Sequence, residues 1–357
     1  MRINRRKFLG NGLTALGSAV VLGCSTIKPA DSGTRKFWRP SSFQKIEQVL
    51  IEDRNVKLRH KHFISQDYPT LIVIGEFHRK KDVQVDQYAV LENIARNTEV
   101  SLLLRENHPR KKRIDRGRIK PIFELYGRVN SAADLSRFYG DNEGIGKLYL
   151  ADRKLVRRYS SSLPPPSDFY ASTLTKAYNL LVSERKLSSL EKGILEALEK
   201  IRIPTIEEKN YIESQDGIRV DQAAASVFVY THPEILSFGV DSDVNEDEAI
   251  DTLDGLFYAL HRIKKTRILT SDEEHLFSAL DRYEHEFVIE GRSREIVNEA
   301  TNLIKCVGSN TSVLIIGHSH EKSTVEALKD KAVNSFYLTV PSMNTYSQED
   351  LFTIIKK

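Results

Sequence analysis

The chain has 357 residues, of which 40% are hydrophobic and 29% charged, as in ordinary globular proteins. Its formal net charge of +4 equals the contribution of Arg2, Arg5, Arg6 and Lys7, so the rest of the chain is close to neutral. Nucleic-acid binding needs a concentrated basic face. We therefore expect no nucleic-acid partner, and the basic run Arg110–Arg113 is interpreted as a solvated loop.

The amino terminus predicts export and lipidation. Asn4–Leu9 is close to the twin-arginine (Tat) export pattern, and Val21–Ser25 resembles a lipobox. A membrane-spanning helix needs about 20 apolar residues, whereas this stretch is shorter and interrupted by glycines. We expect a signal peptide over 1–23, a Cys24 that carries N-palmitoyl and S-diacylglycerol groups, and a tether over 24–45. The protein would then be anchored to a membrane of the cell envelope, outside the cytoplasm.

Apolar runs and helical periodicity alternate in the rest of the chain. A strand at 70–74, a helix at 83–96 and a second strand at 100–104 predict a βαβ unit. Towards the other end we expect a helix at 295–307, a strand at 312–316, a helix at 322–330 and a strand at 336–340. The two ends are interpreted as halves of one sheet. The predicted fold of 46–357 is α/β, with a mainly parallel sheet flanked by helices.

The middle of the chain is less regular. A proline-rich break at 161–166 precedes helical periodicity over 170–202, so a helical insertion is expected at about 160–235, as a cap over the crevice at the carboxyl ends of the strands. Leu236–Asp241 is a further candidate strand end. The acidic run after it begins like a calcium loop, but Glu246 and Thr252 stand where an EF-hand needs Gly and Glu. We reject the EF-hand interpretation.

Two short segments match each other: each is an apolar run that ends in G-x-x-H, at Gly75–His78 and at Gly317–His320. With 18 Gly and 10 His, chance placement gives about half a copy of this pattern. Ligands gather at the carboxyl ends of buried parallel strands, so both histidines are expected in one crevice. A glycine there lets the backbone turn sharply and approach the ligand.

These motifs carry a resemblance. The chain resembles the TraB/Tiki, erythromycin-esterase and ChaN-like superfamily in four features: GExH after one strand, Glu106 after a second, an arginine-rich helix start, and GHxH after a late strand. Its members are described as metal-dependent proteases, esterases or haem-binding lipoproteins. The resemblance implies one site, built from Gly75, Glu76, His78, Glu106, Arg292, Gly317, His318 and His320.

Two versions of a hydrolase are compatible with these residues. In the first, His78, Glu106 and His320 bind Zn²⁺, Mn²⁺ or Co²⁺, Glu76 is the general base, and His318 or Arg292 stabilises an oxyanion. In the second, which is metal-free, a histidine activates water and the glutamates orient it. The expected substrate is a peptide or an ester.

Other interpretations stay open at this stage. Asp241 either caps a following helix or belongs to the site. The alternative function is haem carriage by a ChaN-like lipoprotein, for which the 14 tyrosines and 10 histidines offer axial ligands. The sequence identifies no protein partner.

Overall fold

The computed structural model describes residues 43–77, 81–109, 156–159, 166–184, 186–201, 217–220, 223–241 and 248–345. The predicted signal peptide, Cys24 and its lipids, His78 and the basic run at 110–113 lie outside the described residues. The first described helix begins at Phe43, two residues before the expected end of the tether.

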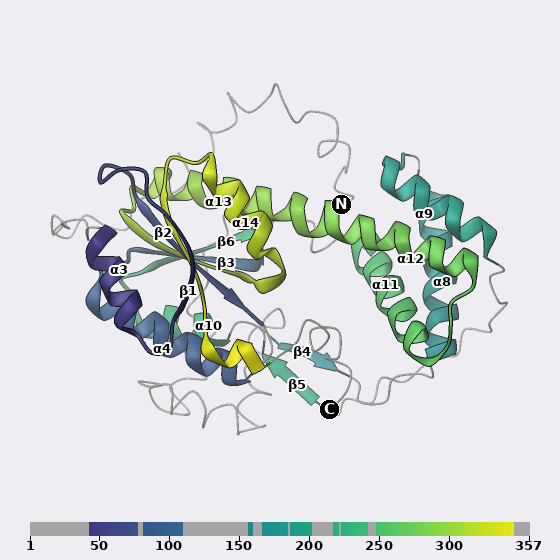
Figure 1. Ribbon diagram of the computed structural model, residues 1–357, viewed down its shortest axis with the longest axis horizontal. Coiled ribbons are helices and arrows are strands. Elements are labelled where there is room, and N and C mark those ends of the chain that lie inside the picture. The colour runs from purple at the N-terminus through teal and green to yellow at the C-terminus, as the bar shows by residue number, and fades with distance from the viewer. Residues whose placement is uncertain are drawn as a thin grey trace.

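A six-stranded sheet forms the centre of the fold, in the order β1-β8-β2-β7-β3-β6 (Figure 1). Its strands are β1 (Lys57–His62), β2 (Thr70–Glu76), β3 (Leu102–Pro109), β6 (Leu236–Asp241), β7 (Thr311–Gly317) and β8 (Asn334–Thr339). Only the edge strand β1 runs antiparallel to its neighbour. This arrangement confirms the predicted α/β class and the joining of both chain ends in one sheet.

The strands form where the sequence carries uninterrupted apolar runs. Every residue of β2, β7 and β8 is buried, as expected for strands covered on both faces. The two strands that end in the glycine motifs lie side by side, because β2 pairs with β7 in a register that aligns Glu76 with Gly317. The carboxyl ends of the two matching segments are therefore neighbours.

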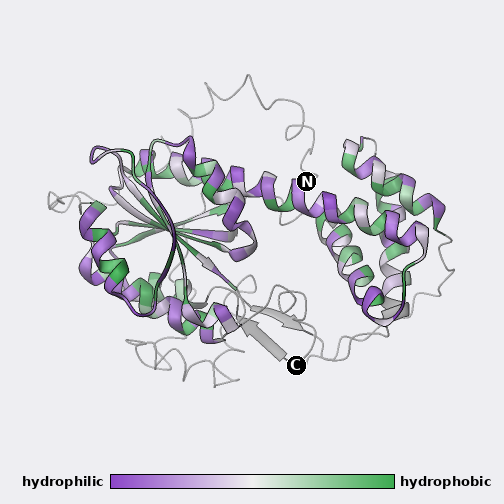
Figure 2. Cartoon of the chain, viewed as in Figure 1, coloured by the Kyte–Doolittle hydropathy of each residue, from purple (hydrophilic) through white to green (hydrophobic). Residues whose placement is uncertain are grey.

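Helices cover both faces of this sheet. They are α3 (Phe43–Glu52), α4 (Lys81–Asn97), α10 (Ala223–Thr231), α13 (Arg292–Val307) and α14 (Glu321–Lys329). One core joins α3, α4 and α10 to the sheet face that carries Ile72 and Ile74; we call it the α4 face. A second core joins α13 and α14 to the opposite face, which carries Leu71 and Val73; we call it the α13 face. Figure 2 shows polar and apolar segments alternating along α3, α4 and α13, as amphipathic helices require.

The connections between strands explain this division of helices. The β2–α4–β3 crossover passes β7, and the β7–α14–β8 crossover passes β2 in the opposite direction. Right-handed crossovers in opposite directions place their helices on opposite faces. The chain thus leaves β2 towards one face and β7 towards the other. In open α/β sheets, ligands bind at the carboxyl edge where the crossover direction reverses between adjacent parallel strands.

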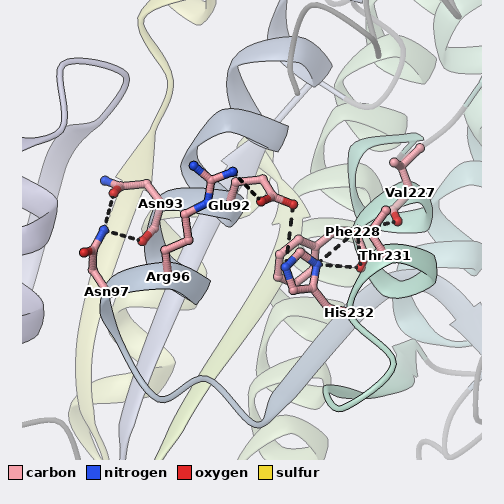
Figure 3. A network of polar contacts seen from close by, with 8 residues as sticks. All are labelled: Glu92, Asn93, Arg96, Asn97, Val227, Phe228, Thr231 and His232. Carbon is pink, nitrogen blue, oxygen red and sulfur yellow. Dashed lines mark hydrogen bonds and ion pairs between the residues drawn. The ribbon is translucent and has the colours of Figure 1, made fainter. Parts of the chain in front are cut away.

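A polar network joins α4 to α10 (Figure 3). The Nε2 of His232 lies 3.7 Å from Glu92, which also pairs with Arg96, and the hydroxyl of Thr231 lies 3.0 Å from Nδ1 of His232. The His232 ring stacks on Phe228 with a centroid distance of 4.3 Å. These contacts hold together two helices of the α4 face, and we interpret them as structural.

The remaining described helices form a cluster of their own. It consists of α8 (Pro166–Ser183), α9 (Ser189–Lys200), α11 (Glu248–Thr266) and α12 (Ser271–Tyr283), which share one apolar core. Capping boxes at Ser188 and Thr270 begin α9 and α12. The helical part thus extends past the expected 160–235 to include α11 and α12, whereas α10, inside that range, packs on the sheet. A separate two-stranded antiparallel sheet pairs β4 (Val156–Tyr159) with β5 (Gly217–Val220).

One long helical run connects this cluster to the sheet. Helix α12 continues into the π-helical segment η2 (Glu284–Gly291) and then into α13 without a break. Figure 1 shows the cluster at the far end of this run from the sheet. Short 3₁₀ turns, η3 (His318–His320) and η4 (Pro341–Thr345), follow β7 and β8. Within the described residues, no helix is long and apolar enough to cross a membrane.

Candidate functional site

Four charged or titratable side chains meet at the carboxyl edge of the sheet, on the α13 face. Glu106 comes from β3, Asp241 from the end of β6, Arg292 from the first position of α13, and His320 from the turn after β7. Glu106, Asp241 and His320 are 1%, 1% and 4% exposed. Charged groups are almost never buried to this extent unless they are paired.

Arg292 links the two carboxylates of this group. Its Nε and Nη2 donate to Oδ1 and Oδ2 of Asp241 at 2.9 and 2.6 Å, and Nη2 also lies 2.9 Å from Oε1 of Glu106. Burial alone would lower the pKa of the Arg292 guanidinium, but Glu106 and Asp241 outweigh it and raise that pKa. The guanidinium is therefore charged at every physiological pH and serves as the shared counterion.

A chain of hydrogen bonds fixes the orientation of the His320 ring. The hydroxyl of Ser293 donates to the carbonyl of Ile289 at 2.6 Å, so towards Nδ1 of His320, 2.8 Å away, it can only accept. This network assigns the Nδ1–H tautomer to the neutral ring. The lone pair then lies on Nε2, which is 3.4 Å from Oε1 of Glu106.

The π-helical segment η2 lies directly before the residues that hold the site. Arg292 and Ser293 follow it in the same helical run, and Ile289 belongs to it. Single π-helical turns inside α-helices are frequent at functional sites. Burial raises the pKa of Glu284, at the start of this segment, while His320 and Arg292 act in the opposite direction. A third carboxyl group therefore faces the same charged group.

Glu76 lies on the other face of the sheet. Successive side chains of a strand alternate between faces, and Ile72 and Ile74 belong to the α4 core. Consistent with this, Glu76 accepts a hydrogen bond of 2.8 Å from Gln84 of α4, whose carbonyl oxygen accepts from the backbone N–H of Ala224 at 3.0 Å. The structure thus places Glu76 and Glu106 on opposite faces of the sheet, although both belong to the predicted site.

His318 belongs to a second cluster, which is centred on Glu321. Its Nδ1 lies 3.4 Å from Oε2 of Glu321, and the other oxygen of that carboxylate receives Arg59 at 3.2 Å and His60 at 3.0 Å. The ring meets Phe77 edge to face, with centroids 5.6 Å apart. Burial lowers the pKa of His318 below its ordinary 6.5, so the ring is neutral at pH 7. A neutral imidazole suits hydrogen bonding better than charge stabilisation.

Of the three predicted metal ligands, the structure describes Glu106 and His320. His78 lies outside the described residues. Both oxygens of Glu106 already accept from donors: Oε1 from Arg292, and Oε2 from the backbone N–H of Gly317 at 2.5 Å. A divalent cation on this carboxylate would lie beside a guanidinium, which is electrostatically unfavourable. In the part of the chain that the structure describes, no group of three His, Cys, Asp or Glu has the arrangement of a metal site.

Sequence reasoning missed two residues at this edge. Ser293 orients His320, but a serine near a helix start gives no sign of a partner 27 residues away. Tyr337 of β8 is 1% exposed and belongs to the α13 core, and sequence reasoning interpreted it only as part of a strand. Comparison with known proteins adds no further candidate: no protein-family model, no curated protein and no solved structure matches this chain.

Proposed function

We propose that this protein is a hydrolase of esters or peptides in which His320 acts as general base. One observation carries the proposal: Nδ1 of His320 is fixed by Ser293, and Nε2 lies 3.4 Å from a buried carboxylate. A histidine base needs one nitrogen held by an orienting partner and the other able to accept a proton. This arrangement has both features.

The chemistry assigns a role to each member of the group. Nε2 of His320 takes a proton from a water molecule as the water oxygen adds to the acyl carbon of the substrate. The imidazolium that forms is stabilised by Glu106, whose position Arg292 and Gly317 hold. Collapse of the tetrahedral intermediate breaks the C–O or C–N bond, and the same imidazolium returns the proton to the leaving group.

The donor set favours the metal-free version over the metal-dependent one. Both oxygens of Glu106 already accept from Arg292 and Gly317, and both oxygens of Asp241 accept from Arg292, so these oxygens are engaged by donors rather than available to a cation. Zinc, manganese and cobalt sites instead combine imidazole with carboxylates that are available as ligands. Haem carriage stays a prediction, which an absorption spectrum of the purified protein tests.

The test uses the purified full-length chain with His320→Ala and, as a matched control, His232→Ala. His232 is also a histidine held by polar contacts, but it is 18% exposed and belongs to the α4–α10 network. Hydrolysis of p-nitrophenyl butyrate and of a fluorogenic casein is measured with and without chelator, and circular dichroism checks folding. We expect His320→Ala to lose 10²- to 10⁴-fold in kcat/KM, and the control to keep its activity.

Three outcomes count against the proposal. Wild-type protein that hydrolyses neither probe overturns the hydrolase assignment. A folded His320→Ala variant with wild-type activity overturns the role of the histidine. Activity that chelator abolishes and Zn²⁺, Mn²⁺ or Co²⁺ restores replaces the metal-free version with the metal-dependent one.

A further inference from the structure

A buried phenol lies at the same edge of the sheet. Tyr337 is 1% exposed, and its hydroxyl oxygen has no hydrogen-bond partner among the described residues. The side chain extends from β8 over the end of β2. A methyl group placed on Gly75 would lie 3.0 Å from Cε1 and Cζ of the ring, and closer still to the hydroxyl oxygen. Gly75 therefore makes room for this hydroxyl group.

The register places this hydroxyl group beside the candidate site. Tyr337 pairs with Val73 and reaches Gly75, so the side chain leans towards the carboxyl edge. It belongs to the α13 core, on the same face as the Glu106 group. Only β7 separates β2 from β3, so about two strand spacings, roughly 10 Å, lie between the end of the phenol and the strand of Glu106.

The hydroxyl group has no structural use that we can identify. An unpaired buried hydroxyl destabilises a fold, and a phenylalanine would fill the same space without that cost. Burial, together with the nearby charges of Glu321 and Glu106, raises the pKa of Tyr337 well above 10, so the group keeps its proton. It is a hydrogen-bond donor that lacks an acceptor.

We propose that the Tyr337 hydroxyl group is the oxyanion donor of the site, which binds the acyl oxygen of the substrate. This inference rests on the proposed hydrolase function. As the water oxygen adds to the acyl carbon, the carbonyl oxygen gains negative charge, and the phenol O–H donates a hydrogen bond to it. When the intermediate collapses, the charge returns to the carbonyl bond and the phenol keeps its proton. Tyr337 thus takes the part that sequence reasoning gave to His318 or Arg292.

The experiment removes the oxygen atom alone, with Tyr337→Phe. Tyr170→Phe is the matched control, because Tyr170 is also a buried phenol but lies in the core of the helical cluster. Both variants and His320→Ala are assayed on p-nitrophenyl butyrate, and their unfolding midpoints in urea are measured by circular dichroism. We expect Tyr337→Phe to lose 10²- to 10³-fold in kcat, with an unchanged KM and an unfolding midpoint equal to or higher than that of the wild type.

The outcomes separate this inference from the function on which it rests. If His320→Ala is inactive and Tyr337→Phe keeps wild-type kcat, the donor role is overturned and the hydrolase proposal stands. If the wild type hydrolyses neither p-nitrophenyl butyrate nor the casein probe, both fail together. Loss of activity in Tyr337→Phe with a lowered unfolding midpoint, or an equal loss in Tyr170→Phe, assigns the phenol to packing and also overturns the donor role.

Discussion

Two arginines on one helix offer a sharp test of the charged group at the sheet edge. Arg292 is 14% exposed and contacts two carboxylates that are each 1% exposed. Arg294, two residues further on, is 67% exposed and, among the described residues, pairs with Glu290 of the same helical run. Both are replaced by alanine. The two changes remove the same side chain from the same helix, so helix propensity cancels in the comparison.

The structure predicts very different costs. Removing one partner of a buried ion pair leaves uncompensated charge in the interior and costs about 3–5 kcal/mol of unfolding free energy. Arg292→Ala leaves both Asp241 and Glu106 without their guanidinium, so we expect a loss at the upper end of this range. An exposed helix pair contributes only about 0.3–0.5 kcal/mol. Arg294→Ala should therefore cost less than about 0.5 kcal/mol.

Urea unfolding followed by far-ultraviolet circular dichroism measures both costs. Asp241→Asn and the double variant Asp241→Asn/Arg292→Ala complete a double-mutant cycle, in which the double variant should lose less than the sum of the single losses. If Arg292→Ala unfolds at the same urea concentration as Arg294→Ala, or if the losses simply add, Arg292 and Asp241 are not energetically linked. The description of Arg292 as a shared counterion would then be wrong.

Two further predictions concern other parts of the structure. Gly75→Ala should cost about 1–3 kcal/mol of unfolding free energy through overpacking against Tyr337. Because the hydroxyl oxygen of Tyr337 is the nearest atom, combining this change with Tyr337→Phe should recover part of the loss in urea unfolding. An equal loss in the double variant would contradict the close approach. In the helical cluster, the hydrogen bond from Arg267 lowers the pKa of Glu273 from 4.5 to about 2. A lowered pKa in the folded state adds stability above pH 4.5, and this stability is lost as the pH falls towards 2. Arg267→Ala should therefore cost about 1–2 kcal/mol of unfolding free energy at pH 7, a figure discounted because Arg267 is 45% exposed. Near pH 2.5 the cost should be much smaller. Equal costs at both pH values would refute the ion pair between Arg267 and Glu273 as the source of this stability.

The sheet was predictable because its strands leave a strong mark in the sequence. Fully buried strands must be apolar throughout, so the runs at 70–74, 312–316 and 336–340 mark three of them directly. The repeated motif also indicated that two distant strands end at one place, and β2 and β7 are indeed neighbours. Helices α11 and α12 had no such mark, since an amphipathic helix in a separate cluster resembles any other surface helix.

The candidate site was predictable only in part, because its division between faces depends on strand alternation. Glu76 and Glu106 each follow an apolar run, and nothing in the sequence tells which face either side chain joins. The face that a side chain joins depends on the position at which the strand begins, because side chains alternate from there, and on which helix covers that face. Glu76 consequently bonds to Gln84, whereas Glu106 bonds to Arg292. A motif can bring residues to one edge of a sheet without bringing them to one site.

Ser293 and Tyr337 show how the topology completes what the motifs begin. The chain leaves β7 towards the α13 face, so the turn after Gly317 places His320 against α13 and within reach of Ser293. The crossover that follows returns to β8 on the other side of β2, which places Tyr337 over Gly75. One connection thus positions both the proposed base, in the turn directly after β7, and the proposed oxyanion donor, on β8. If the site works as proposed, the opposite directions of the crossovers after β2 and β7 create it, and Gly75, near the end of β2, is needed for the phenol on the neighbouring strand β8.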